Sequence, residues 1–211
     1  ETQRPVLWVT VQFAAGASVG ERVDCDVEVL AHGHRTSQIR LTALVGDRLV
    51  FSAIGAAGLP RERALEVQVA TMPEVAAPED CAEWMPRAVL PAEAGKRGWF
   101  DLSEIREVPD VETGMALWAR MRGARQSASS LGFLADMVPT AVVRAAGRAG
   151  AGTSLDNSIR LGPAPDCEWV LIEFVPYFAR AGYLHGSARI WSPDGVHLAV
   201  ASQTAVAVLF D

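Results

Sequence analysis

The sequence is missing the features that mark several large classes of protein. None of its apolar runs approaches the roughly 20 residues that span a bilayer, and its first residues lack the basic start and cleavage site of a signal peptide. Positive charge is also low, because 19 Lys and Arg face 25 Asp and Glu, for a net charge of −6 with the basic residues scattered. Nucleic-acid binders carry clustered basic residues. We therefore expect no membrane span and no nucleic-acid partner.

Cysteine is scarce, and no metal-binding pattern is present. Cys25, Cys81 and Cys167 are an odd number at wide spacing, without a CxxC pair or a Cys/His cluster. His32 and His34 flank a glycine, but no further ligands are positioned to complete a metal site. We therefore expect a cytoplasmic protein with free thiols, and with neither a metal nor an organic cofactor.

The sequence does contain enough apolar material for a substantial core. Half of the 211 residues are hydrophobic, and a chain of this length can bury roughly 70% of its unfolded surface. The first half alternates β-branched, apolar segments with turn-like segments, which is typical of an antiparallel meander. Strands are predicted at 6–13, 22–30, 35–45 and 48–57. A proline-rich, acidic stretch over 59–95 follows, and we interpret it as a linker with one short helix.

The second half is predicted to combine a helix with further strands. Residues 127–148 are rich in Ala, Leu and Met and begin with serines suited to an N-cap. Pro139 should break this helix just after Asp136, because proline removes a backbone donor and crowds the preceding turn. Strands are predicted at 98–108, 114–122, 153–162, 168–178, 182–192 and 197–210.

The two halves are similar in pattern, which suggests an internal duplication. Residues 37–57 match 185–206, with one residue more in the second turn. We therefore divide the chain into a first half at 1–58, a linker at 59–95 and a second half at 96–211. A helix precedes the last four strands, but only five residues precede the strand at Val6. An antiparallel sheet needs a cover over its apolar face, so we expect the missing helix upstream of this sequence or from another chain.

Three polar residues stand at marked positions in the second half. Asp136 ends the first part of the predicted helix, Ser154 lies on the next strand and Gln203 lies on the last strand. Gln203 falls opposite Ile54 in the repeat, and an amide on an alanine-rich strand face needs hydrogen-bond partners. A carboxylate with an amide and a hydroxyl nearby could hold and polarise a water molecule for attack on an acyl group.

Each of these residues also has a plain structural interpretation. Asp136 could be a solvated carboxylate at a helix end, and Gln203 could bond to the backbone near a sheet edge. Ser154 has no GxSxG elbow around it and no histidine in an evident triad relation. A hydrogen-bonding hydroxyl is therefore favoured over a serine nucleophile.

Several segments resemble one known family. They are LGFLADMVPTAV at 131–142, GTSLDNSIRL at 152–161, the run from CEWVLIEF to WSPDG at 167–195, and LAVASQTAV at 198–206. With the first half from RPVLWVTVQF to SAIGAAG, they resemble the type II, TesB-like acyl-CoA thioesterases of the double-hotdog family. The resemblance covers most of the chain except the linker.

The resemblance implies an α+β double hotdog, with two antiparallel sheets that each wrap a helix. It implies hydrolysis of fatty acyl-CoA to free fatty acid and CoA, with the catalytic Asp, hydroxyl and Gln falling on Asp136, Ser154 and Gln203. Adjacent Thr153 is an alternative for the hydroxyl. A non-catalytic acyl-CoA or fatty-acid binding protein is the alternative function. Long sheet edges need partners, so we also expect a homo-oligomer.

Overall fold

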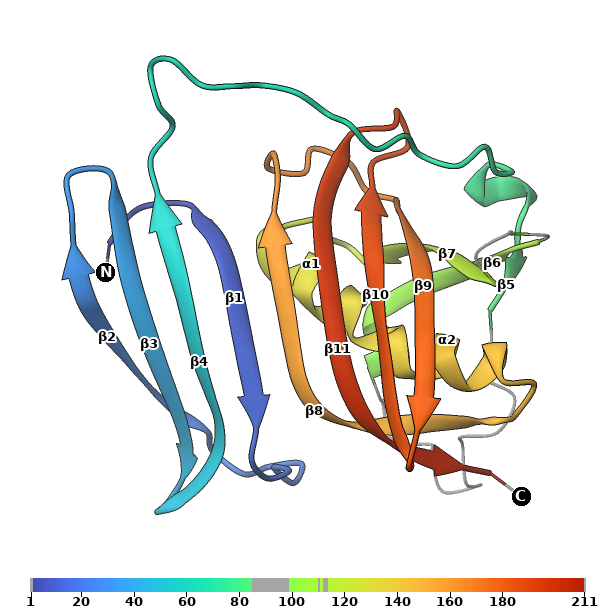
Figure 1. Cartoon of the computed structure of the whole chain (residues 1–211), viewed down its shortest axis with the longest axis horizontal. Helices are drawn as coiled ribbons and strands as arrows, with labels where there is room; N and C mark the ends of the chain where they lie inside the picture. The colour runs from blue at the N-terminus through green and yellow to red at the C-terminus, as the bar shows by residue number, and fades with distance from the viewer. Residues whose placement is uncertain (1, 85–98, 110, 112–113, 211) are drawn as a thin grey trace.

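A computed structural model describes residues 2–84, 99–109, 111 and 114–210 (Figure 1). Within these residues the strands form one antiparallel sheet of eleven strands, in the order β2-β3-β4-β1-β8-β11-β10-β9-β7-β6-β5. A helical segment lies against one face of the sheet, over its second half.

The first half is the four-stranded meander that its apolar segments predict. Its strands are β1 (Val6–Phe13), β2 (Asp24–His32), β3 (Thr36–Val45) and β4 (Arg48–Gly58). All four predictions are confirmed to within two residues. No helix is found in residues 2–58, so within the described residues the expected pairing of a sheet with its own helix holds only for the second half.

Within the described residues, the second half supplies six further strands. They are β6 (Ser103–Val108), β7 (Met115–Met121), β8 (Gly150–Leu161), β9 (Val170–Arg180), β10 (Tyr183–Trp191) and β11 (His197–Leu209). The two-residue strand β5 (Ala82–Glu83) lies in the expected linker. The prediction of a strand over 98–108 is wrong in its first part, because Trp99–Leu102 forms a 3-10 helix (η2). Residue 98 itself is outside the described residues.

The helix between β7 and β8 is broken where Pro139 predicts. Its parts are α1 (Ala128–Leu134), a 3-10 turn η3 (Ala135–Met137) and α2 (Val138–Ala145). The Ser127 side chain accepts a hydrogen bond from the Ser130 backbone N–H and caps α1. Pro139 lies in the first turn of α2, where its missing N–H costs nothing. No helix of the described chain is long and apolar enough to cross a membrane.

The helical segment buries its apolar face against the second half of the sheet. Leu131, Leu134 and Val138 join Ile172 and Phe174 in one core cluster, and each such side chain contributes about 1.5–3 kcal/mol on burial. Two glycines on the strands allow α2 to approach this closely. A Cβ on Gly152 would lie 2.6 Å from the Pro139 Cβ, and one on Gly186 would lie 2.9 Å from a Val138 methyl.

The two expected sheets are joined into one. β1 and β8 pair antiparallel from Trp8 with Arg160 to Gln12 with Asp156. Each strand therefore provides hydrogen-bond partners for the backbone groups that the other would leave free at a sheet edge. This pairing places the first half directly beside the helix-covered half. The sheet then ends in β2 on one side and in the two-residue β5 on the other.

The repeat pairs two residues that lie on opposite faces. Ile54 is 52% exposed and lies between buried Ala53 and Gly55, so it faces outward. Gln203 is 4% exposed and shares its face with buried alanines of β11. The expected correspondence of Gln203 with Ile54 is therefore wrong in register, because one residue of offset reverses the face of a strand.

The linker prediction can be followed only as far as residue 84, since residues 85–95 are outside the described chain. Its described part contains the short 3-10 helix η1 (Pro78–Asp80). Ala70, Met72 and Val75 pack against the outer side of the second half, in a cluster around Trp118 and Trp191. The linker thus covers the sheet face opposite the helix.

Candidate active site

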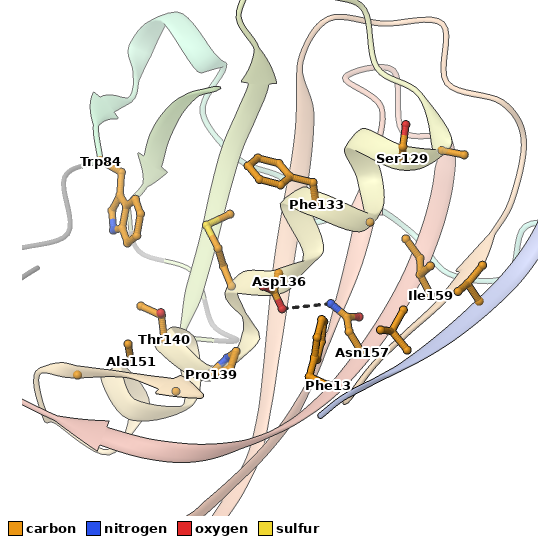
Figure 2. Close-up of a pocket in the computed structure, with 17 residues that line it drawn as sticks. Phe13, Trp84, Ser129, Phe133, Asp136, Pro139, Thr140, Ala151, Asn157 and Ile159 are labelled. Atoms are coloured by element: carbon orange, nitrogen blue, oxygen red, sulfur yellow. Dashed lines mark hydrogen bonds between the residues drawn. The ribbon is translucent and has the colours of Figure 1, made fainter. Parts of the chain in front are cut away.

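The break in the helix places Asp136 at the centre of a hydrogen-bonded group. Its Oδ1 accepts hydrogen bonds from Gln203 Nε2, from Ser154 Oγ at 3.4 Å and from Asn157 Nδ2 at 3.4 Å. Figure 2 shows the Asp136 carboxylate pointing toward Asn157. The structure therefore brings together all three residues predicted from the sequence, and it adds Asn157.

Gln203 is the buried member of the group. Its Nε2 donates both to Asp136 Oδ1 and to Ser154 Oγ, the latter at 2.7 Å. Its Oε1 is buried and has no hydrogen-bond partner among the described residues. Because β11 is an interior strand and the amide bonds to side chains, the interpretation of Gln203 as an edge residue bonded to backbone is wrong.

A β-bulge in β8 aims two side chains at Asp136. Thr204 of β11 pairs with Asp156 while Ala205 pairs with Ser154, so Leu155 is an extra residue in β8. Residues 154 and 157 would face opposite sides of a regular strand, but the extra residue puts both on the helix side. Bulges of this kind recur beside active sites because they re-aim side chains.

Asp156 and Thr153 lie outside the group. The Asp156 carboxylate accepts a hydrogen bond of 2.8 Å from the Thr204 backbone N–H, at the point where the bulge interrupts the ladder. Thr153 is exposed and precedes Ser154 on a strand whose side chains alternate. Ser154 is therefore the hydroxyl that reaches Asp136 and Gln203.

The surroundings of Asp136 make it a stronger base than a free aspartate. Burial of the carboxylate among protein atoms raises its pKa above the ordinary 3.8, and hydrogen bonds from Gln203, Asn157 and Ser154 oppose that rise. The side chain still opens onto a cavity. A carboxylate with these properties can take a proton from a bound water molecule.

The cavity beside Asp136 has a volume of about 590 Å³ and mainly apolar walls (Figure 2). The helical segment supplies one wall, with Phe133, Met137 and Pro139 among its residues. The first half of the chain supplies another, since β1 contributes Val9, Val11 and Phe13. This size and lining are typical of a site for an apolar ligand with a few polar contacts.

Other candidate chemistry is not concentrated in the described part of the chain. Cys25, Cys81 and Cys167 are free thiols. Within residues 2–84, 99–109, 111 and 114–210, no three His, Cys, Asp or Glu side chains are grouped as metal ligands. Asn157 is the residue that sequence reasoning passed over, although it follows Ser154 and Asp156 in the same SLDNS segment.

Comparisons with known proteins agree on one kind of relative. Residues 68–207 match a family model described as the acyl-CoA thioesterase C-terminal domain. A candidate thioesterase from Novosphingobium aromaticivorans is 32% identical with a TM-score of 0.88, over 97% of this chain and 80% of that one. No protein with a curated description matches the sequence.

Two more distant solved structures share the fold. A protein with a hot dog fold from Alicyclobacillus acidocaldarius is 22% identical with a TM-score of 0.83, over 97% of this chain and 79% of that one. An acyl-CoA thioesterase II from Mycobacterium marinum is 17% identical with a TM-score of 0.77, over 100% and 83% of the two chains.

Proposed function

Because the chain belongs to the TesB-like acyl-CoA thioesterase family and is a thioester hydrolase with a hot dog fold, we propose that it hydrolyses fatty acyl-CoA with a water molecule activated by Asp136. The observation that carries this proposal is the hydrogen-bonded group beside an apolar cavity, which Asp136 and Asn157 help to line. One oxygen of Asp136 is held by Gln203, Ser154 and Asn157. The products are free fatty acid and CoA.

Asp136 acts as the general base. Its hydrogen bonds from Gln203, Ser154 and Asn157 all end on Oδ1, which leaves Oδ2 to accept a proton from water. The water oxygen bonds to the thioester carbonyl carbon, and the carbonyl π electrons move onto its oxygen. When the carbonyl re-forms, the C–S bond breaks and the thiolate leaves. The proton held by Asp136 returns to that sulfur, so the carboxylate is regenerated.

Ser154 and Gln203 hold the base in place. The two N–H groups of Gln203 divide between Asp136 and the Ser154 oxygen, and the Ser154 hydroxyl in turn donates to Asp136. Each link fixes the orientation of the next, which is the preorganisation that a general base needs. This use of the Ser154 hydroxyl favours attack by water over a covalent acyl-enzyme.

The apolar cavity would receive the acyl chain. Its walls come from both halves of the chain, because β1 of the first half faces the helical segment of the second. We further propose that 1–58 and 96–211 are two hotdog units joined by the linker at 59–95. The strand order supports this division, since the two four-stranded groups β2-β3-β4-β1 and β8-β11-β10-β9 meet at β1 and β8. A cytoplasmic homo-oligomer stays a prediction from the sequence.

The test is release of CoA thiol from acyl-CoAs of increasing chain length. Asp136→Asn should lower turnover by about 100-fold or more, because an amide cannot take the proton. Asp47→Asn, in the exposed turn between β3 and β4, is the matched control and should retain activity. Saturable binding of acyl-CoA without turnover in wild type would favour the non-catalytic alternative, and full activity in Asp136→Asn would remove the assigned base.

The pH dependence of activity is a second test of Asp136 as the base. Activity requires the ionised carboxylate, and burial raises the pKa of Asp136. We therefore expect kcat/KM to fall as the pH drops through this raised pKa, so that the acidic limb lies above pH 3.8. An acidic limb at or below the ordinary aspartate value would contradict the assignment.

A further inference from the structure

Asn157 stands out in the hydrogen-bonded group because it faces the cavity. Asp136 and Asn157 line the cavity, whereas the cavity wall does not include Ser154 or Gln203. Figure 2 shows the Asn157 side chain beside that of Asp136, with the hydrogen bond between them drawn as a dashed line. A substrate that reaches Asp136 therefore meets Asn157 beside it.

The amide group of Asn157 has a defined orientation. Its Nδ2 lies 3.4 Å from Asp136 Oδ1. The opposite orientation would point the amide oxygen at a carboxylate oxygen, and two acceptors repel each other. With one N–H directed at Asp136, the second N–H of the same nitrogen is available to another acceptor.

The surroundings of Asn157 make that second donor effective. Val11 is its partner across the β1 and β8 pair, Gln203 is its partner across the β8 and β11 pair, and Ile159 follows it on the same face of β8. Val11 and Ile159 give it an apolar side toward the cavity, and a hydrogen bond in such a setting is stronger than one in water. The bulge at Leu155 fixes the position from the backbone, because it turns residue 157 toward the helix.

We propose that Asn157 is a catalytic residue of the proposed hydrolysis, whose second Nδ2–H donates to the thioester carbonyl oxygen as that oxygen becomes negative. A carbonyl attacked by a water molecule on Asp136 lies within reach of this donor, because the two side chains are in direct contact. No proton is transferred by Asn157. The hydrogen bond strengthens as charge develops on oxygen and weakens again when the C–S bond breaks.

This inference rests on the proposed function, so its test includes a measurement that does not need turnover. An acyl-CoA analogue with a methylene in place of the thioester sulfur carries a ketone that cannot be hydrolysed. With a 13C label at the ketone, its carbonyl stretch in the bound state reports hydrogen bonding directly. We expect a lower stretching frequency on wild-type protein than in Asn157→Leu and Asn157→Ala.

The kinetic readout separates contact with substrate from an effect through Asp136. Loss of an oxyanion donor should lower kcat by roughly 10²–10³-fold, with KM nearly unchanged and the loss present at every pH. A residue that acted only through Asp136 would instead move the acidic limb and leave the plateau at high pH intact. Ser158→Ala, on the outer face of the same strand and bonded to Thr10, is the control for disturbance of β8 and should behave as wild type.

The outcomes are distinct. An unchanged carbonyl frequency in both Asn157 variants, which still bind the analogue, overturns the proposal even if their activity falls. Absence of turnover in wild type overturns the proposed function, and full activity in Asp136→Asn removes Asp136 as its base. In either case the carbonyl frequency still decides whether Asn157 contacts the ligand. The proposal is supported if both variants abolish the frequency shift and also lower kcat on the plateau at high pH.

Discussion

The two halves of the chain differ most clearly in what they place on the inner face of the sheet. In the first half, the inner face of β4 carries apolar or small residues, namely Phe51, Ala53 and Gly55. In the second half, β11 interrupts a row of buried alanines with Gln203. A sheet face can thus serve as a scaffold or hold a reactive group, and a single amide among small residues accounts for the difference at this position.

The two halves also differ in the backbone geometry of the strands where they meet, β1 and β8. β1 keeps a regular pairing from Trp8 to Phe13 and turns Val9, Val11 and Phe13 into the cavity. β8 pairs with it but contains the extra residue Leu155, and the bulge directs Asn157 into the same cavity and Ser154 toward Asp136. The first half supplies an apolar wall, and the second half supplies the polar group.

The first prediction removes the amide that distinguishes the two inner faces. Gln203→Leu should lower kcat by roughly 10²–10³-fold, because the donor that holds Asp136 and Ser154 is lost. Initial rates of CoA release measure the effect, with thermal unfolding to show that the variant is folded. Ile54→Gln places an amide on the outer face of the first half and should leave activity unchanged. If Gln203→Leu were as active as wild type, the inner face would not need its amide.

The second prediction concerns α2, which packs closely against β8 of the second half. Gly152→Ala should destabilise the protein by about 1–3 kcal/mol, because its Cβ would lie 2.6 Å from the Pro139 Cβ and 2.8 Å from the Ala205 Cβ. Urea unfolding measures this change. Gly16→Ala, in the first half with nothing within 4 Å of its Cβ, should change stability by no more than about 0.5 kcal/mol. Equal effects at the two sites would contradict the close packing of α2 on β8.

The third prediction tests the first half as a wall of the cavity. Val11→Ala removes two methyl groups that face the ligand and should raise KM for a long-chain acyl-CoA by about three- to tenfold. The value of kcat should change little, because the lost contact is made equally in the bound and transition states. Val27→Ala on β2 is the control, since Val27 does not line the cavity. A fall in kcat alone would assign Val11 to the chemistry instead.

The smallest predicted effect is a gain in stability. Compared with the unfolded chain, the native state binds the proton of Asp136 more tightly, since burial raises the pKa of this carboxyl above 3.8. That stability contribution is complete below the ordinary pKa and is lost as the pH rises through the raised pKa. Asp136→Asn avoids this loss and should raise Tm at neutral pH by about 2 °C, a small change because the side chain opens onto the cavity.

The dependence on pH provides the control for this last prediction. The difference in Tm between Asp136→Asn and wild type should shrink as the pH is lowered through the raised pKa, where the carboxyl is already neutral. Asp47→Asn should show no comparable gain. A stabilisation of Asp136→Asn that persisted unchanged at low pH would have another cause.

The local pattern of the sequence was sufficient to predict most of the strands and the broken helix. The alternation and turn residues of the first half predict β1 to β4 closely, and Pro139 predicts the break beside Asp136. Residues 99–102 were predicted wrongly as strand, because a short apolar run does not distinguish a strand from a 3-10 turn. The joining of both halves through β1 and β8 depends on contacts distant in sequence, which no local pattern contains.

The site was predictable as a set of residue types but not as a geometry. The family resemblance singled out Asp136, Ser154 and Gln203, and the structure brings them into contact. Asn157 was not found, because strict alternation along β8 places residues 154 and 157 on opposite faces. The bulge reverses that expectation, and its cause lies in pairing with β11 rather than in the SLDNS segment alone.

The way the sheet ends affects how the protein avoids aggregation. With β1 and β8 paired and β5 only two residues long, β2 is the one extended strand of the described sheet with a free edge. Asp24, Asp26 and Glu28 alternate along β2, and all are exposed. Arg22 pairs with Asp24 and Arg40 pairs with Glu28, so the edge is lined by exposed charged groups of both signs. A second copy that added its own β2 there would have to remove water from these groups, which opposes growth of the sheet into a fibril.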